Sequence, residues 1–436
     1  MKFGGTSVGR PERMHQVKDL ITRSTEPTVV VLSALSGTTN ALVGIGEALA
    51  SANKVLAKER IDSLHSHYLN FYPELLKTPA ARVKAEDIVK EHFEFLNILL
   101  KISFNEAIQR DILAQGELLS TKLFHTLLEE LEIPAVLLPA LDFMSIDENS
   151  EPELGQISER LKALLSQYPD QQLFITQGYI CKNHRNEVDN LKRGGSDYTA
   201  SLVAAAIQAS VCEIWTDIDG MHNNDPRVVD RTRPIAELSF DEAAELAYFG
   251  AKILHPASIW PAQLHNVPVR LLNTMDPAAA GTLIKAEVAE TGVKAIAAKD
   301  GITAINIKSS RMLLAYGFLR RIFEVFESFK TPIDMITTSE VAVSVTIDDL
   351  SHLDQIVEEL RRFGTVEVDS NQAIVCVVGN QVAETKGAIQ SVMDSLVDIP
   401  VRMVSFGGSK HNVSILIDAQ YKVQALKNLN EGVFTW

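Results

Sequence analysis

Short apolar runs alternate with longer segments of helical period from the start of the chain to about Ile284. Several runs are apolar at every position, which is typical of strands buried on both faces of a parallel sheet. The expected strands are 28–32, 135–138, 173–176, 211–215 and 267–272, and the clearest expected helices are 105–128 and 197–209. This alternation predicts βαβ units and a mostly parallel sheet.

After Gly292 the elements become shorter and follow the order strand, helix, strand, strand, helix, which is then repeated. The first round is expected at 302–307, 318–329, 333–337, 341–347 and 350–363, and the second begins near Ala373. Two βαββαβ units in tandem fit this order. The helix 318–329 places six apolar side chains on one face, as a helix packed on a sheet does: Phe318, Leu319, Ile322, Val325, Phe326 and Phe329.

We therefore expect three domains, formed by residues 1–290, 298–368 and 369–436. The second βαββαβ unit has few residues left for a closing strand after its last helix, which is expected at about 420–429. Residues 293–297 are a candidate for that strand. If they supply it, the first unit is inserted within the second.

Composition argues against a nucleic-acid-binding protein, a membrane protein and a cysteine-based metal site. The chain has a net charge of −15 and no long basic stripe, which argues against a nucleic-acid partner. No apolar run approaches the roughly 18 residues of a membrane helix, and Met1–Gly9 carries no apolar leader, so we expect a cytoplasmic protein without a membrane partner. The three cysteines lie far apart, with no His or Cys at ligand spacing, and predict no metal site.

Three glycine-containing loops carry residue types that bind phosphate. They are 2–7 (KFGGTS), 33–40 (SALSGTTN), which follows an expected buried strand, and 193–200 (RGGSDYTA), which runs into an Ala-rich helix. Backbone N–H groups at glycines and at a helix N-terminus attract anions. Each loop also has a plainer interpretation, as a tight turn or as a set of helix N-cap residues.

Two further segments carry charge near expected strand or helix ends. Residues 216–220 (TDIDG), followed by 225–227 (DPR), could contact a ribose or a metal, although a turn is the commoner role of such a sequence. Residues 250–256 (GAKILHP) place Lys252 either in solvent or on a phosphate.

Taken together and in this order, the motifs KFGGTSV, SALSGTTN, GELLST, RGGSDYTA, WTDIDG, NDPRVV and GAKILHP resemble the aspartate kinases over almost the whole chain. The segments GFL and ITTSEVAVSVT resemble the lysine-responsive, monofunctional branch. The resemblance implies an α/β fold, an amino acid kinase αβα sandwich with a mostly parallel central sheet, followed by two ferredoxin-like βαββαβ ACT domains.

The resemblance also implies roles for individual residues. Lys2 and Asp197 are expected to be catalytic, with the carboxylate holding the lysine. Phosphate contacts are expected from Gly4, Gly5, Ser33, Gly37, Gly194 and Gly195. Substrate contacts are expected from Thr39, Glu117, Tyr179, Arg193 and Ser196, and ATP contacts from Thr216, Asp217, His222, Arg227 and Lys252. Four residues depart from the family pattern: Tyr179, Cys181, Lys192 and His222.

An effector site is implied in the first ACT domain. It would consist of Met312, Gly317, Phe318, Leu319, Asp334, Thr338, Ser339 and Glu340, and would bind an amino acid, with lysine expected. Leu314 and Ala315 depart from the expected polar residues. The alternative is a folded dimerisation module with solvated carboxylates.

The implied reaction transfers the γ-phosphate of ATP to the β-carboxylate of aspartate with Mg²⁺, giving 4-phospho-L-aspartate at the start of lysine, threonine and methionine biosynthesis. No histidine is expected to act in it, and a homodimer or a dimer of dimers through the ACT domains is expected. The alternatives are another amino acid kinase, disfavoured by Glu117 and the ACT pair, and a catalytically inactive sensor, disfavoured by Lys2 and Asp197. The identity of the effector and a native start upstream of Met1 stay open.

Overall fold

The computed structural model describes residues 1–191, 194–250, 254–312 and 316–434. The chain forms two compact units. The first contains Met1–Met221 and Leu254–Ala286, and the second contains His222–Ile253 and Glu287–Trp436. Among the helices in the described ranges, none combines the length and apolar character required to span a bilayer.

The first unit is built on a mostly parallel sheet with the strand order β3-β4-β2-β1-β7-β9-β10. Its strands are β1 (Lys2–Phe3), β2 (Thr28–Leu32), β3 (Val136–Leu138), β4 (Leu173–Gln177), β7 (Cys212–Thr216), β9 (Val269–Asn273) and β10 (Thr282–Lys285). Among these strand pairs, only β9 and β10 are antiparallel, and the others are parallel. All five strands expected from the sequence are confirmed, with ends that move by at most two residues.

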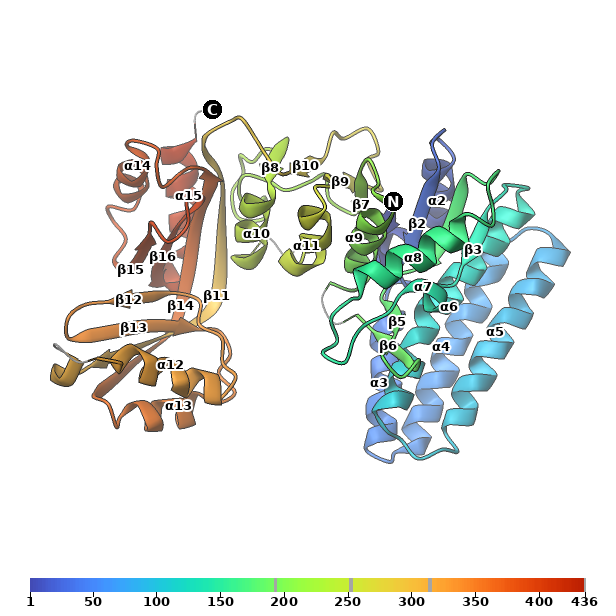
Figure 1. Cartoon of the computed structure of the whole chain (residues 1–436), viewed down its shortest axis with the longest axis horizontal. Coiled ribbons are helices and arrows are strands. Elements are labelled where there is room, and N and C mark those ends of the chain that lie inside the picture. Colours follow the sequence, from blue (N-terminus) through green and yellow to red (C-terminus); the bar gives the residue numbers. More distant parts are fainter. Residues whose placement is uncertain (192–193, 251–253, 313–315, 435–436) are drawn as a thin grey trace. The chain divides into compact units, whose positions relative to one another are not determined.

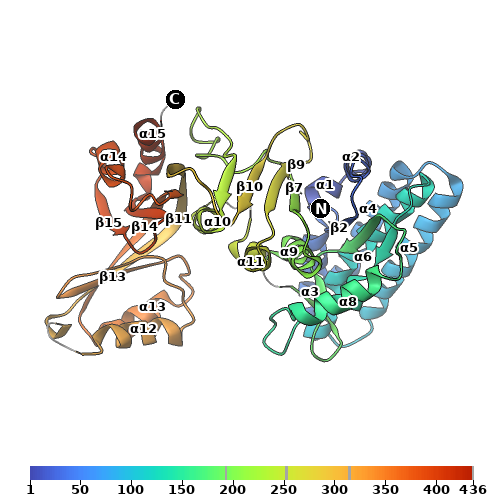
Figure 2. The same cartoon turned by 45° about the horizontal axis from the view of Figure 1, so that its top comes forward.

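Helices cover both faces of this sheet (Figures 1 and 2). They are α1 (Gly5–Val8), α2 (Pro11–Ile21), α3 (Thr38–Ala50), α4 (Lys54–Leu75), α5 (Pro79–Leu99), α6 (Glu106–Glu130), α7 (Ala140–Phe143), α8 (Leu154–Leu165), α9 (Gly195–Ile207) and α11 (Pro256–Leu264), and a hairpin of β5 (Ile180–Lys182) and β6 (Val188–Asn190) joins them. In β4, Leu173 and Ile175 enter the core shared with α3 to α6, while Phe174 enters the core shared with α8 and α9. Burial on both faces explains why the strands are apolar throughout.

The second unit contains an antiparallel sheet with the order β12-β13-β11-β14-β16-β15. Its elements are β8 (Glu237–Ser239), α10 (Phe240–Tyr248), β11 (Gly292–Lys308), α12 (Phe318–Ser328), β12 (Ile336–Thr338), β13 (Ala342–Ile347), α13 (Leu353–Leu360), β14 (Thr365–Asn380), α14 (Ala388–Ser395), β15 (Val401–Phe406), β16 (Asn412–Asp418) and α15 (Lys422–Val433). In Figure 1, α12 and α13 lie at one end of this sheet and α14 and α15 at the other.

The two long strands β11 and β14 pair along their whole length and run through both ends of the sheet. Ala295 pairs with Val378 near one end, and Ile307 pairs with Val366 near the other. Each end has its own apolar core, one with α12 and α13 and one with α14 and α15. The two βαββαβ lobes thus share continuous strands, and the expected boundary at 368/369 falls inside β14.

One sequence expectation about packing is wrong. Phe318, Ile322 and Phe326 are buried in the core of the first lobe, but Leu319 is 38% exposed. Leu319 follows Phe318 directly at the start of α12. A step of one residue rotates a helical side chain by about 100°, which takes Leu319 off the buried stripe.

Residues 222–253 pack with the second unit although they precede its main part in sequence. The N–H of Ile296 donates to the carbonyl of Asn223 at 2.9 Å. The buried Asn224 side chain donates to the carbonyl of Leu426 on α15 at 3.1 Å. Residues expected to contact ATP, His222 and Arg227, therefore belong to the same unit as the paired βαββαβ lobes.

Candidate active site

Four adjacent parallel strands end side by side at one edge of the sheet in the first unit. The register aligns Phe3 of β1 with Leu32 of β2 and with Trp215 of β7, and aligns Leu32 with Gln177 of β4. The residues that follow these strand ends include Gly4, Ser33 and Gly178. Ligands of open α/β sheets bind at the carboxyl ends of the strands, so this edge is the candidate site.

The centre of this edge is an ion pair between Lys2 and Asp197. Lys2 Nζ lies 2.6 Å from Asp197 Oδ1, and the two side chains are only 11% and 17% exposed. Lys2 is in β1, and Asp197 is in the first turn of α9. A Cβ on Gly4 would lie 3.3 Å from Lys2 Nζ, so a side chain there would crowd the ammonium group. The structure therefore holds one cation at the sheet edge in a fixed position.

The N-terminus of α9 adds backbone donors beside this ion pair. The helix begins at Gly195 after Gly194, and both glycines have positive φ, of 67° and 50°. A Cβ on Gly194 would lie 2.6 Å from Ser258 Cβ, so this close approach also requires glycine. The free N–H groups and the dipole of a 13-residue helix favour an anion at this end.

A hydrogen bond fixes the loop after β2 to α9. Ser33 Oγ donates to Ser196 Oγ at 2.8 Å, so two residues expected to bind ligand are in contact. Gly178, which follows β4, packs against the same serine, because a Cβ there would lie 2.2 Å from Ser196 Oγ and 2.9 Å from Ser196 Cα. Gly178 was not identified from the sequence.

Gly178→Ala should lower the free energy of unfolding by about 1–3 kcal/mol, because the new methyl group meets the Ser196 backbone and overpacks the site. Gly155→Ala is the matched control, since a Cβ at Gly155 in α8 meets nothing within 4 Å. Denaturant unfolding of the two variants measures the difference. Equal stability of both variants would contradict the close packing at Gly178.

Glu117 lies on α6 and is almost completely buried, with 3% exposure. Its Oε1 accepts from the Ala34 N–H at 3.3 Å, and its Oε2 has no hydrogen-bond partner among the described residues. Burial raises the pKa of Glu117 to about 8. An unpaired buried carboxylate oxygen is costly. A bound ammonium group would satisfy it.

Several neighbours position Glu117 and its surroundings without having been singled out from the sequence. Ser120 Oγ donates to the carbonyl of Ser33 at 2.8 Å, and Gln177 Nε2 donates to Thr121 Oγ1 at 2.9 Å. Ser120 lies one turn after Glu117 on the same helix face, which is the signal that could have identified it. These bonds tie α6 to the ends of β2 and β4.

Tyr179 occupies an unusual backbone conformation at the same edge. Its φ is 67°, and its N–H donates to Thr199 Oγ1 of α9 at 2.9 Å. Burial raises the pKa of the Tyr179 hydroxyl to about 12, so it is a neutral donor at physiological pH. The structure thus holds Tyr179 beside α9.

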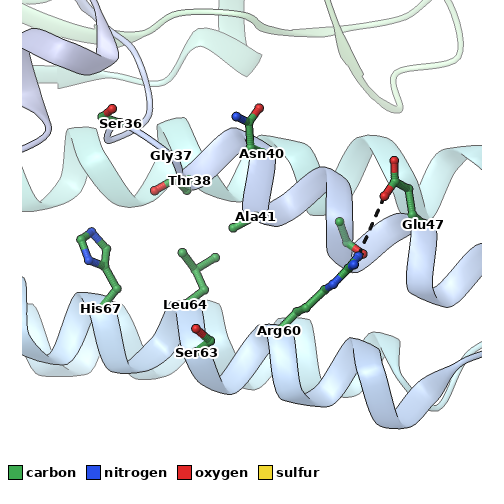
Figure 3. A pocket seen from close by; sticks show the side chains of 11 residues that line it. Ser36, Gly37, Thr38, Asn40, Ala41, Glu47, Arg60, Ser63, Leu64 and His67 are labelled. Carbon is green, nitrogen blue, oxygen red and sulfur yellow. Dashed lines mark hydrogen bonds and ion pairs between the residues drawn. The ribbon is translucent and has the colours of Figure 1, made fainter.

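A pocket of about 510 Å³ lies between α3 and α4 (Figure 3). Ser36, Gly37 and Asn40 line it from the loop before α3 and the first turn of that helix, and His67 lines it from α4. Gly37 caps α3 with a φ of 83°. Thr39 is exposed in the same first turn.

The residues expected to contact ATP are divided between the two units. Thr216 ends β7 and donates to Asp217 Oδ1 at 3.2 Å, and Asp217 is exposed. In the second unit, His222 Nδ1 lies 3.2 Å from Thr232 Oγ1, and the Arg227 guanidinium donates two hydrogen bonds to the Asp225 carboxylate. Lys252, also expected to contact ATP, and Arg193, expected to contact aspartate, lie outside the described residues.

The expected effector residues all belong to the first lobe of the second unit. Met312 packs against the core that contains Phe318, and Gly317 caps α12 with a φ of 75°. Asp334 has a buried side chain, 2% exposed, that precedes β12. Three residues at the end of β12 and after it are exposed: Thr338, Ser339 and Glu340. Leu314 and Ala315 lie outside the described residues.

Comparisons with known proteins agree with this architecture. The family model of the amino acid kinase family matches residues 1–273, and an ACT domain model matches residues 375–432. Lysine-sensitive aspartokinase 3 of Escherichia coli is 32% identical over 445 residues, covering 99% of this chain and 98% of the relative. Aspartokinase 2, chloroplastic, of Arabidopsis thaliana is 33% identical, covering 100% of this chain and 84% of the relative.

Solved structures give the same relationship. The crystal structure of E. coli aspartokinase III with aspartate and ADP, in the R-state, has a TM-score of 0.84 at 32% identity and covers 100% of this chain and 99% of its own. The structure of that enzyme with lysine and aspartate, in the T-state, has a TM-score of 0.82. The expected fold class is confirmed. With full-length identity above 30% and a kinase model that matches more than half of the chain, this chain belongs to the amino acid kinase family and, within it, to the aspartokinases.

Proposed function

We propose that the chain transfers the γ-phosphate of ATP to the β-carboxylate of L-aspartate, giving 4-phospho-L-aspartate and ADP. The observation that carries the proposal is the Lys2–Asp197 ion pair at the carboxyl edge of the sheet, beside the N-terminus of α9. One relative supports the choice of substrate: E. coli aspartokinase III aligns with this chain over nearly its full length and was crystallised with aspartate and ADP.

The reaction requires positioning and positive charge more than acid–base chemistry. The attacking group is a carboxylate, which is already ionised at neutral pH, so no general base has to remove a proton. Negative charge spreads over the transferred oxygens in the transition state. Lys2 and the N–H groups at the start of α9 provide fixed positive charge and hydrogen bonds for those oxygens.

The substrate amino group is assigned to Glu117. Its buried Oε2 lacks a partner, and an α-ammonium group would supply both the hydrogen bond and the compensating charge. We assign a substrate carboxylate to Arg193, whose guanidinium can form a bidentate pair. Tyr179 and Ser196 complete the proposed aspartate contacts, and Lys252 the proposed ATP contacts.

Mg²⁺ is the proposed metal, bound together with ATP. In the described part of the chain, no group of three or more His, Cys, Asp and Glu side chains is arranged to hold a metal ion. Mg²⁺ in nucleotide sites is held by phosphates, water and one or two carboxylates. The ion would neutralise phosphate charge at the sheet edge.

Feedback inhibition by lysine and a cytoplasmic homodimer through the ACT lobes complete the proposal. The relative crystallised with lysine and aspartate supports the effector. The edge strand β12 begins with the exposed Ile336, and the exposed Val341 follows the strand, which supports pairing of two copies. Three free buried cysteines fit a reducing compartment.

Trapping the acyl phosphate with hydroxylamine tests the activity. Purified protein with ATP and Mg²⁺ should form aspartyl hydroxamate when aspartate is supplied and no hydroxamate when N-acetylglutamate replaces it. Product with N-acetylglutamate alone would assign the chain to a sister kinase. A protein that forms no product but binds lysine would be a sensor.

A further inference from the structure

Tyr68 of α4 is a completely buried residue that is not among the proposed substrate contacts. Its side chain is 0% exposed, and its hydroxyl lies 3.2 Å from Thr38 Oγ1 at the start of α3. Thr38 is itself only 1% exposed. Buried hydroxyl groups are almost always hydrogen-bonded, because an unsatisfied one is costly. The hydrogen bond between the two hydroxyls therefore ties the start of α3 to α4.

Aromatic packing fixes the Tyr68 ring on its own side of this bond. Its centroid lies 5.8 Å from that of Phe93 on α5 and 5.7 Å from that of the His67 ring. Phe93 is 1% exposed and stacks on His65, with the ring centroids 4.4 Å apart. A ring that is packed in this way keeps its orientation, so the hydroxyl is presented to Thr38 in one position.

Thr38 is joined through a short stretch of backbone to the donor that contacts Glu117. The Thr38 N–H donates to the carbonyl of Leu35 at 3.0 Å, and the N–H of the neighbouring Ala34 donates to Glu117 Oε1 at 3.3 Å. Thr39, which was expected to contact the substrate, follows Thr38 directly. A displacement of Thr38 would therefore move both the donor to Glu117 and Thr39.

The same loop packs tightly on α6 at the position just before Glu117. A Cβ on Gly116 would lie 2.8 Å from Ala34 Cβ and 3.3 Å from Thr38 Cγ2. Burial raises the pKa of the Tyr68 hydroxyl, and the charge of the nearby Glu117 adds to this rise. Tyr68 is thus a neutral hydrogen-bonding group close to the buried carboxylate.

We propose that Tyr68 is a positioning residue for aspartate binding, an inference that rests on the proposed function, in which Glu117 binds the substrate ammonium. The Tyr68 hydroxyl holds Thr38, and the loop that follows β2 then keeps the Ala34 N–H on Oε1 of Glu117. Oε2 is left for the substrate. Binding groups keep their productive geometry when their neighbours are locked by packing and by hydrogen bonds. In this role Tyr68 acts through Thr38 and the loop.

Steady-state kinetics of the full-length protein with hydroxylamine trapping, over a range of pH, tests this role. Tyr68→Phe removes only the hydroxyl. It should raise the KM for aspartate about tenfold while kcat and the KM for ATP change less than about threefold, because the loss falls on the binding of one substrate. Burial raises the pKa of Glu117, and the Ala34 hydrogen bond opposes that rise. Weakening this bond should move the increase in kcat/KM for aspartate to higher pH by about half a unit or more.

A second variant removes the same hydrogen bond from its other end. Thr38→Val should raise the KM for aspartate and shift the pH profile as Tyr68→Phe does. The double variant should match the more affected single variant within about twofold, because both substitutions remove one shared interaction. Effects of the two substitutions that multiply would show that they act independently and would overturn the proposal.

Tyr72→Phe is the matched control, because Tyr72 lies one turn later on α4 and is only 8% exposed. This variant should keep the wild-type KM for aspartate and the wild-type pH profile. Equal losses in Tyr72→Phe and Tyr68→Phe would reduce Tyr68 to general support of the core and overturn the proposal. A wild type that forms no aspartyl hydroxamate refutes the proposed reaction and the positioning role with it, whereas an unaffected Tyr68→Phe in an active protein refutes the positioning role alone.

Discussion

Replacement of Lys2 by methionine should lower kcat for aspartyl phosphate formation about 10³-fold, with a change in the KM for ATP of less than about threefold. The reason is that Lys2 presents its charge where negative charge develops in the transition state, and loss of one such group costs about 10²–10³ in rate. The ammonium group is largely buried and lies 2.6 Å from Asp197, which fixes its position. Steady-state kinetics with hydroxylamine trapping measures the effect.

The same substitution leaves Asp197 as a poorly solvated charge, which can destabilise the fold by about 3–5 kcal/mol. The double variant Lys2→Met, Asp197→Asn removes that unpaired charge and should recover most of the lost melting temperature without recovering activity. Recovery of activity in the double variant would mean that Lys2 acts only through stability.

Glu117→Gln should lower kcat/KM for aspartate about 10²-fold at pH 9, with little change in the KM for ATP. Removing one member of a buried, hydrogen-bonded charge pair weakens binding by about 2–5 kcal/mol. The amide keeps the shape of the side chain but removes its charge. Initial rates at limiting aspartate, over a range of pH, provide the measurement.

The role of Glu117 also predicts how kcat/KM for aspartate changes with pH. Burial raises the pKa of this carboxyl from 4.5 to about 8, so it is mostly protonated at pH 7 in the unliganded protein. The ionised form binds the ammonium, and wild-type kcat/KM for aspartate should therefore rise as pH increases through about 8. Glu117→Gln should lack this rise. A wild-type profile that is flat from pH 6.5 to 8.5 would contradict the assignment.

The folding stability of the wild type should fall as pH rises, whereas its kcat/KM for aspartate should increase. The pKa of Glu117 is higher in the folded state than in the unfolded state, so its contribution to stability is fully present below about pH 4.5 and is lost as pH rises through about 8. Glu117→Gln removes this loss, and its melting temperature should fall less than that of the wild type between pH 5 and 8.

Much of the site was predictable because its residues follow strand ends. Ser33 comes directly after the apolar run 28–32, and parallel strands bring their carboxyl ends to one edge whatever their order. The Lys2–Asp197 contact, in contrast, was implied only by the family resemblance. Nothing in the local sequence pairs residues that lie 195 positions apart.

The features that sequence reasoning missed depend on register and on long-range packing. Gly178 is important because β4 lies beside β2 and brings it against Ser196. The hydrogen bond between Tyr68 and Thr38 joins residues 30 positions apart. The long helices α4 and α5 were not among the expected elements, and the grouping of residues 222–253 with the second unit was also unexpected. Periodicity describes which face of an element is buried, not which partner covers it.

The two βαββαβ lobes share strands, although two separate units were expected from the sequence. The repeated order of strands and helices indicated two βαββαβ units, and each lobe has its own helices and core. The strands β11 and β14 nevertheless continue from one lobe to the other. Continuous hydrogen-bonded strands resist bending at the junction, so we expect a change in one lobe to be transmitted to the other.

Oxygen transfer from aspartate to phosphate tests the central claim most directly. Aspartate labelled with ¹⁸O in its β-carboxylate is incubated with ATP, Mg²⁺ and hydroxylamine, and the released phosphate is examined by ³¹P NMR. If the carboxylate attacks the γ-phosphorus, one labelled oxygen joins carbon to phosphorus, and the attack of hydroxylamine on the acyl carbon releases phosphate that carries one ¹⁸O. Unlabelled phosphate, formed with or without aspartate, would mean that water is the acceptor and would contradict the account.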